Sequence, residues 1–294
     1  MTPARRRAAV TWLRQRYAFS ERRACRLVGI GRASARYRTA RDGDAAVRAR
    51  LRALGAERPR FGYRRLHAPL RREGVVVNHK QIERLYREEG LAVRRRSRKR
   101  LARDGRGAPP APTRPDERWG LAFVSDALAG GRRIRLLCVL DLFTREALAI
   151  EVDVSLPGAR VVAVLARLAA ERGRPAEIVL DNGPELTGRA LEAWAATLGV
   201  RPRFIAPGKP SQNGYVESFN GRFRDECLDQ AWFTGLADAR ATVEAWRLDD
   251  TSRRPHSALG YRTPDEARAA FWATNTTTTT TTTKPGVQST DGLS

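Results

Sequence analysis

The chain has 294 residues, of which 41% are apolar, so it is long enough for two domains, at least one with a sizeable core. No stretch reaches the roughly 18–20 uncharged apolar residues of a membrane span, and the charged N-terminus is not followed by the apolar segment of a signal peptide. Its three cysteines are far apart, and with three histidines they show no metal-ligand spacing, which excludes a disulfide framework and a structural zinc site.

The positive charge is confined to the first third of the chain. Residues 1–110 contain 32 lysines and arginines against 9 acidic residues, whereas residues 111–294 contain 23 of each. Arginine supplies nearly all of the excess, and its guanidinium fits phosphate better than an ammonium group does. Nucleic acid is therefore the expected partner of this third.

The basic third is expected to be helical throughout. Val10, Leu13 and Tyr17 repeat at helical spacing, and a second helix ends at Gly29, which together predict a helix-turn-helix within residues 1–40. A second, basic helix-turn-helix-like region is predicted over residues 45–105.

The clearest helix of this second region begins after Asn78. Asn78 is a favourable N-cap, and Gly90 suits the position that follows the helix. Lys80, Arg84 and Arg87 share one face, which could lie along a DNA groove. The alternative is a solvated polar face with no DNA contact.

A proline-rich linker is expected over residues 106–116, extended and solvated. From residue 117 to 274 the pattern predicts three consecutive strands, followed by helices alternating with two further strands. This order predicts an α/β fold, a ribonuclease H-like catalytic core with a mixed five-stranded sheet and helices on both faces, preceded by the all-α region. A threonine-rich tail over residues 275–294 is expected to be disordered.

Two carboxylates of the expected core are candidates for chemistry. Asp181 follows a short strand, at the edge where the sites of open α/β sheets gather, although an Asp-Asn-Gly turn also uses its Asp to satisfy backbone donors. Glu217 shares a helical face with Asn213, Asn220 and Arg224. Carboxylate and amide oxygens beside a cation suit a magnesium-dependent phosphodiester site, and an exposed charged helix is the alternative.

Several sequence strings together resemble the orfB-type transposases of the third insertion-sequence family, relatives of the retroviral integrases, over roughly residues 45–270. They are the Arg118-Trp119 pair and the segments 139–145, 180–185, 207–210, 217–228 and 254–261, with segments 61–65 and 77–80 similar to the family's helix-turn-helix.

The resemblance implies a DDE recombinase, in which three carboxylates hold two Mg²⁺ or Mn²⁺ ions during attack on a phosphodiester. Asp181 and Glu217 would be the second and third carboxylates, and Arg224 a basic residue near the DNA. The DNA-binding residues expected from these motifs and from the helical faces are Lys80, Arg84, Arg87, Arg64, Arg65, Lys209, Asn213 and Asn220.

The resemblance further implies a cytoplasmic, nucleoid-associated bacterial protein that does not act at a membrane. Its expected partners are terminal inverted repeats and target DNA, further copies of the chain on DNA, and the product of an upstream orfA reading frame.

The position of the first carboxylate departs from the family. It lies three residues after the strand tryptophan, where this chain has Ala122. Asp126 lies four residues further on, roughly 13 Å away along a strand. Asp141 is expected opposite Trp119, about three residues out of register, so both are weak substitutes.

The departure leaves two functions open. The first is a transposase that binds terminal inverted repeats and catalyses metal-dependent strand cleavage and transfer, with its catalytic competence in question at Ala122. The alternative is a non-catalytic DNA-binding remnant or regulator of the element. A general nuclease is disfavoured by the dedicated basic N-terminal region.

Overall fold

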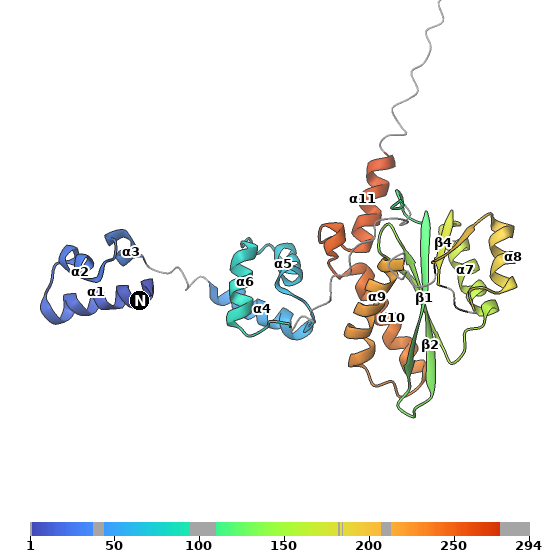
Figure 1. The fold of residues 1–294 in the computed structure, drawn as a ribbon, viewed down its shortest axis with the longest axis horizontal. Helices are drawn as coiled ribbons and strands as arrows, with labels where there is room; N and C mark the ends of the chain where they lie inside the picture. The colour runs from blue at the N-terminus through green and yellow to red at the C-terminus, as the bar shows by residue number, and fades with distance from the viewer. Residues whose placement is uncertain are drawn as a thin grey trace, which may run out of the picture. The chain divides into compact units, whose positions relative to one another are not determined.

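The computed structural model in Figure 1 describes residues 2–37, 44–93, 110–181, 183, 185–206 and 213–276. It divides into two compact units, one formed by residues 1–59 and 70–92 and the other by residues 60–69 and 93–294. Within the described ranges, none of the helices has the length and apolar character that crossing a bilayer requires.

The first three helices form a small body around a short apolar core. Its buried residues are Val10, Ala24 and Cys25, and partly buried Leu13 and Val28 pack against them. Gly29, with φ +67°, ends the second helix, because glycine adopts this left-handed conformation without steric cost. The helices are α1 (Pro3–Tyr17), α2 (Glu21–Val28) and α3 (Arg32–Arg36).

Three further helices lie within residues 44–93. The Asn78 side chain caps the last of them by accepting a hydrogen bond from the Lys80 backbone N–H at 2.9 Å, and Gly90 follows it with φ +70°. Ile82 and Leu85 are fully buried, as their spacing predicts. The helices are α4 (Ala45–Glu57), α5 (Tyr63–Arg72) and α6 (His79–Glu88).

A five-stranded mixed sheet in the order β3-β2-β1-β4-β5 forms the centre of the second unit. β1 to β3 are antiparallel neighbours, whereas β1, β4 and β5 run parallel. This arrangement confirms the expected ribonuclease H-like core. The strands are β1 (Arg118–Ala127), β2 (Arg133–Asp141), β3 (Ala147–Asp153), β4 (Glu177–Leu180) and β5 (Arg201–Phe204).

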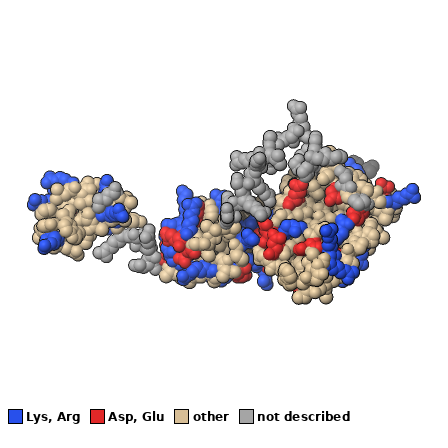
Figure 2. All heavy atoms as spheres, turned by 60° about the horizontal axis from the view of Figure 1, so that its bottom comes forward, with Lys and Arg blue, Asp and Glu red and all other residues tan. Residues whose placement is uncertain are grey.

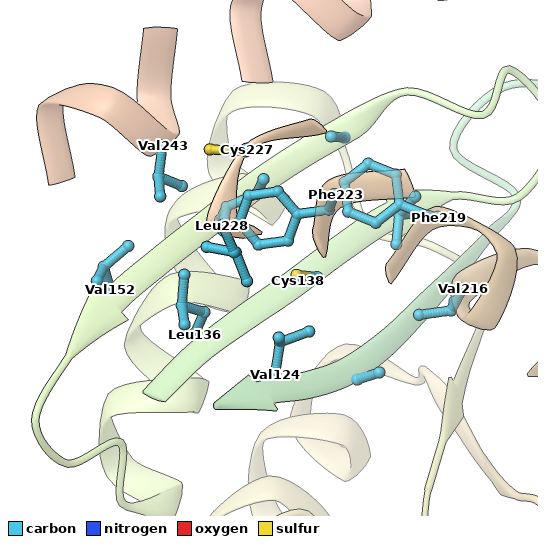
Figure 3. Packing of buried hydrophobic residues seen from close by; sticks show 14 of the residues in the cluster. Val124, Leu136, Cys138, Val152, Val216, Phe219, Phe223, Cys227, Leu228 and Val243 are labelled. Carbon is cyan, nitrogen blue, oxygen red and sulfur yellow. The ribbon is translucent and has the colours of Figure 1, made fainter. Parts of the chain in front are cut away.

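Helices cover both faces of the sheet, as Figure 1 shows. α7 and α8 cover one face, over a cluster that includes Trp119 and Leu121. α9 and α10 cover the other, where Val216, Phe219 and Phe223 lie over strand residues such as Val124 and Cys138 (Figure 3). Alternate residues of β1 therefore belong to different faces. The helices of this unit are α7 (Gly158–Arg172), α8 (Arg189–Leu198), α9 (Gly214–Glu226), α10 (Leu236–Ser252) and α11 (Pro264–Thr276), with short 3-10 turns η3 (Leu228–Gln230) and η4 (Ser257–Leu259).

The edges of the core differ from the expected ones. In the segment assigned to a solvated linker, Pro112 and Pro115 are buried. Glu117 accepts hydrogen bonds from the Thr113 backbone N–H and hydroxyl, which fold the segment back onto the core. At the other end, α11 continues to Thr276, two residues into the expected tail, and residues 277–294 lie outside the described part of the chain.

Candidate active site

The pairing of β1 with β4 places Ala122 beside Asp181. Gly120 is the partner of Val179 in this parallel pair, so the same register continued by two residues brings position 122 level with Asp181. Ala122 and Val179 both belong to the apolar cluster under α9. Side chains two apart share a face, so Asp181 follows Val179 on the α9 face as well. Position 122 is thus where a carboxylate would face both Asp181 and α9.

Asp181 uses one of its oxygens within its own loop. The side chain is partly exposed, and its Oδ1 accepts a hydrogen bond from the Gly183 backbone N–H at 3.0 Å. This is the local turn that the Asp-Asn-Gly sequence favours.

α9 carries Glu217 in its first turn, exposed to solvent. The first turn of a helix favours a carboxylate, because the unpaired N–H groups there carry partial positive charge. Val216, the residue before it, is fully buried in the apolar cluster. Val216 thus packs this turn of α9 onto the sheet, and the neighbouring Glu217 is exposed to solvent.

Hydrogen bonds to β1 hold α9 along the strand on both sides of Ala122. Asn213, which is 5% exposed, donates from Nδ2 to the Leu121 carbonyl at 3.2 Å. Arg224 donates from Nη2 to the Ser125 carbonyl at 3.0 Å and remains exposed. Asn213 thus lies in the contact between helix and strand.

The four residues expected on one face of α9 have different surroundings. Asn213 is buried, Asn220 is partly buried, and Glu217 and Arg224 are exposed. The Oδ1 atoms of both asparagines are buried and accept no hydrogen bond from the described residues.

The contact between α9 and β1 is tightest at Gly120. A Cβ atom added there would lie 2.6 Å from Val216 Cγ2 and 2.7 Å from Leu142 Cδ2. The missing side chain is therefore a condition for the present position of α9.

Asp126 lies toward the C-terminal end of α9, whereas Glu217 lies in the first turn of this helix. Its Oδ1 accepts a hydrogen bond from the Ala127 backbone N–H, and it pairs across the sheet with Ile134. Burial, and then the charge of Asp126, raise the pKa of the Cys227 thiol to about 12, which places Asp126 near the residue that follows α9. It therefore lies away from position 122.

Asp141 is opposite Trp119, in the register expected from the sequence. It is fully buried and accepts hydrogen bonds from the Thr144 hydroxyl at 2.6 Å and the Thr144 N–H at 3.0 Å. Burial raises the pKa of this carboxyl group. These contacts show that Asp141 closes the turn between β2 and β3.

The residues around position 122 do not fit a two-metal site. In the described residues, no group of three or more His, Cys, Asp or Glu side chains could hold a metal ion. Two metals that share a ligand need a bridging carboxylate. The methyl group of Ala122 offers no oxygen.

The expected DNA-binding residues of the N-terminal third differ in whether they form ion pairs with carboxylates. Arg84 pairs with Asp44 at 2.7 Å, and Arg87 pairs with Glu83 at 2.7 Å. Lys80 on the same helix makes no ion pair with any described residue. The free positive charge on this face is thus smaller than the spacing alone indicates.

Of the remaining expected DNA-binding residues, Asn213 is the N-cap residue of α9 and Asn220 lies within this helix, whereas the others lie on α5 or outside the described residues. Arg64 donates from Nε to the Tyr63 hydroxyl at 3.0 Å, and Arg65 lies 3.8 Å from Glu226. Lys209 belongs to the residues that the structure leaves undescribed.

Sequence reasoning gave no role to Arg254 and His256, although both lie in one of the quoted motifs. Arg254 is 3% exposed, donates to Glu226 at the end of α9, and lies 3.3 Å from Asp250. Nε2 of His256 lies 3.1 Å from the Asp250 backbone carbonyl oxygen. These buried contacts tie α9 to α10, and the Arg-Pro-His sequence was the available signal.

A cavity of about 250 Å³ lies beside α9, with Tyr215, Ser218 and Arg222 of that helix in its wall. Neither Asp181 nor Glu217 lines it. The guanidinium of Arg145 stacks on the Tyr215 ring, 3.4 Å from its centroid. The cavity is therefore separate from Asp181 and Glu217, whereas Asp141 lies in its wall.

Comparison with known protein families matches most of the chain. An HTH-like domain covers residues 42–100, and two integrase core domain families cover residues 112–210 and 198–264. The match of the first family begins before α4, and those of the integrase core include Asp181 and Glu217.

Individual proteins give the same picture. The uncharacterized 31.7 kDa protein of insertion element IS407 from Burkholderia multivorans is 51% identical over 263 residues, covering 89% of this chain and 95% of that protein. Transposase InsD for insertion element IS2A/D/F/H/I/K from Escherichia coli is 30% identical over 239 residues, covering 76% of this chain and 78% of that protein. The HTLV-2 integrase catalytic core domain in complex with magnesium is 12% identical, with a TM-score of 0.43 over 53% of this chain and 97% of that structure. From the family matches and the sequence relatives, the chain belongs to the orfB-type transposases of the third insertion-sequence family, in the superfamily of DDE transposases and retroviral integrases.

Proposed function

We propose that this chain binds the terminal inverted repeats of an insertion element and that Ala122 disables the strand transfer its family performs. The observation that carries the proposal is the register of β1 and β4, which brings Ala122 level with Asp181 under α9. The chain then acts as a DNA-binding member of its family that occupies element ends without joining them to target DNA.

The DNA-binding half of the proposal is supported by charge and by family. The first 110 residues hold the whole positive excess of the chain, and the HTH-like family match falls inside them. Lys80 is the exposed, unpaired cation on the described face of α6. A sequence-specific protein needs such phosphate contacts for affinity and a few base contacts for specificity.

The proposed loss of strand transfer is supported by comparing the carboxylates that this chain has with the one that it lacks. By resemblance, Asp181 and Glu217 would be the family's second and third carboxylates, and Arg224 its basic residue near the DNA. Mg²⁺ requires nearly octahedral oxygen coordination, so two ions sharing one ligand depend on the carboxylate at position 122.

The proposal also concerns the assembly on DNA. Joining or bridging an element requires both of its ends to be held at once, and this chain has one integrase core. We therefore expect at least two copies of the chain on a pair of repeat ends.

The proposal is tested by two assays on one preparation of the full chain. Binding is measured by fluorescence anisotropy with a terminal-repeat duplex and with a scrambled duplex of the same length. Joining is measured with the same repeat duplex and a supercoiled target in Mg²⁺ and in Mn²⁺. We expect preferential binding of the repeat duplex and no joined product above background. Equal binding of both duplexes contradicts the recognition of ends, and efficient joining contradicts the loss of chemistry.

A further inference from the structure

The body formed by α1, α2 and α3 has a charge composition unlike the rest of the described chain. Residues 2–37 contain ten arginines and a single acidic residue, Glu21. Residues 44–93 contain twelve basic and six acidic residues. The first segment lies outside all three family matches, which begin at residue 42.

Most arginines of this body have no acidic partner among the residues that the structure describes. Glu21 pairs with Arg36 at 2.9 Å and lies 3.6 Å from Arg32. Six others are exposed and make no ion pair with any residue in the described ranges: Arg5, Arg14, Arg16, Arg22, Arg23 and Arg26. Their guanidinium groups are available to an external anion.

The arginines of α4 and α6 lie near carboxylates. Arg48 lies 2.7 Å from Glu89, and Arg50 lies 2.6 Å from Glu73. Arg84 lies 2.7 Å from Asp44. Figure 2 shows the difference on one face, where α1–α3 bear blue side chains without red ones and the next helices bear both colours. A phosphate would have to displace a carboxylate from these arginines, but not from those of α1 and α2.

The backbone of this body suits duplex DNA. Helix α2 and the short helix α3 are joined by the three residues Gly29–Gly31, the length and composition of a helix-turn-helix connection. Arg6 donates from Nη1 to the Gly29 carbonyl at 3.0 Å and so ties α1 to this turn. The unpaired arginines therefore lie on a body with a fixed core and not on an extended tail.

We propose that residues 2–37 form a separate DNA-binding module, which holds the phosphate backbone of duplex DNA through the unpaired arginines of α1 and α2. This inference rests on the proposed function and adds to it a second part of the chain that supplies salt-sensitive affinity. The arginines of α4 and α6 then bind fewer phosphates than their number indicates, because carboxylates already hold them.

The test compares two triple variants of the full chain that remove the same charge. The first is Arg14→Gln, Arg22→Gln, Arg26→Gln, which removes unpaired arginines. The matched control is Arg48→Gln, Arg50→Gln, Arg52→Gln, which removes arginines that lie near carboxylates. The affinity for a 30-base-pair duplex is measured between 50 and 300 mM KCl, and circular dichroism verifies the helix content of each variant.

The slope of log K against log salt is expected to fall by about 0.9 for each phosphate that a variant no longer neutralises, so by about 2.7 in the first variant if all three arginines bind phosphate. The control is expected to retain the slope of the parent chain. Equal slopes for the parent chain and the first variant, or a larger change in the control, overturn this inference and leave the proposed function standing. A parent chain that binds no duplex, or binds duplex RNA more tightly than DNA, contradicts both.

Discussion

At Gly120 the absence of a side chain lets α9 lie directly on β1. A Cβ atom there would fall within 2.7 Å of two buried methyl groups, of Val216 and Leu142. We expect Gly120→Ala to lower the free energy of unfolding by about 1–3 kcal/mol, because overpacking forces buried side chains or the helix to move. Gly130→Ala is the matched control, since no atom lies within 4 Å of its added Cβ. Urea unfolding of both variants measures the difference, and equal stability would show that α9 yields without cost.

The buried ring of His256 makes the stability of the core depend on pH. Burial, and then the nearby Arg222, lower the pKa of His256 to about 3. In the unfolded chain this imidazole takes up a proton near pH 6.5, whereas in the folded chain it does so only near pH 3. The stability that His256 contributes is therefore complete above pH 6.5 and is lost as the pH falls toward 3.

Asp250 contributes with the opposite sign. Burial raises its pKa to about 6, so the stability it contributes is complete below pH 3.8 and is lost as the pH rises through 6. His256→Gln isolates the histidine, because Asp250 remains in both chains. We expect the parent chain to lose more stability than this variant between pH 7 and pH 4.5 in urea titrations. Exposed His79→Gln is the control, and parallel losses in His256→Gln and the parent chain would contradict the account.

At the scale of elements, α6 has two arginines paired with carboxylates and a lysine, Lys80, that makes no ion pair within the described ranges. We expect Lys80→Ala to reduce discrimination between repeat and scrambled duplexes more than Arg87→Ala does, because Arg87 must first leave Glu83. Competition binding at one fixed salt concentration measures both ratios. A larger effect at Arg87 would show that DNA readily displaces its carboxylate.

Local sequence signals predicted the elements well, because they depend on short-range rules. Asn78 and Gly90 bound α6 as expected, and hairpin register alone placed Asp141 opposite Trp119. Contacts between distant residues could not be predicted in this way. The burial of Asn213 depends on the Leu121 carbonyl, 92 residues away, and the burial of Pro112 depends on packing against the core. Helical spacing placed Asn213 and Glu217 on one face without indicating that one is buried and the other exposed.

At the scale of the whole molecule, the sequence showed the departure at Ala122 but not where this residue lies in the fold. The resemblance identified the residue, whereas the strand register brings it level with Asp181 and the packing of α9 places it on the same face. The proposed function therefore predicts that this chain separates the binding of DNA from the joining of DNA.

The central claim is that one missing carboxylate limits the chemistry of this chain. The most direct measurement is strand transfer by Ala122→Asp in Mg²⁺, compared with the parent chain and with Ala122→Asp combined with Glu217→Gln. We expect no product above background from the parent, at least about a hundredfold more from Ala122→Asp, and a return to background in the double variant, which keeps its shape but loses a metal ligand. Full activity of the parent chain, or no gain in an Ala122→Asp protein that folds and binds DNA normally, would contradict this account.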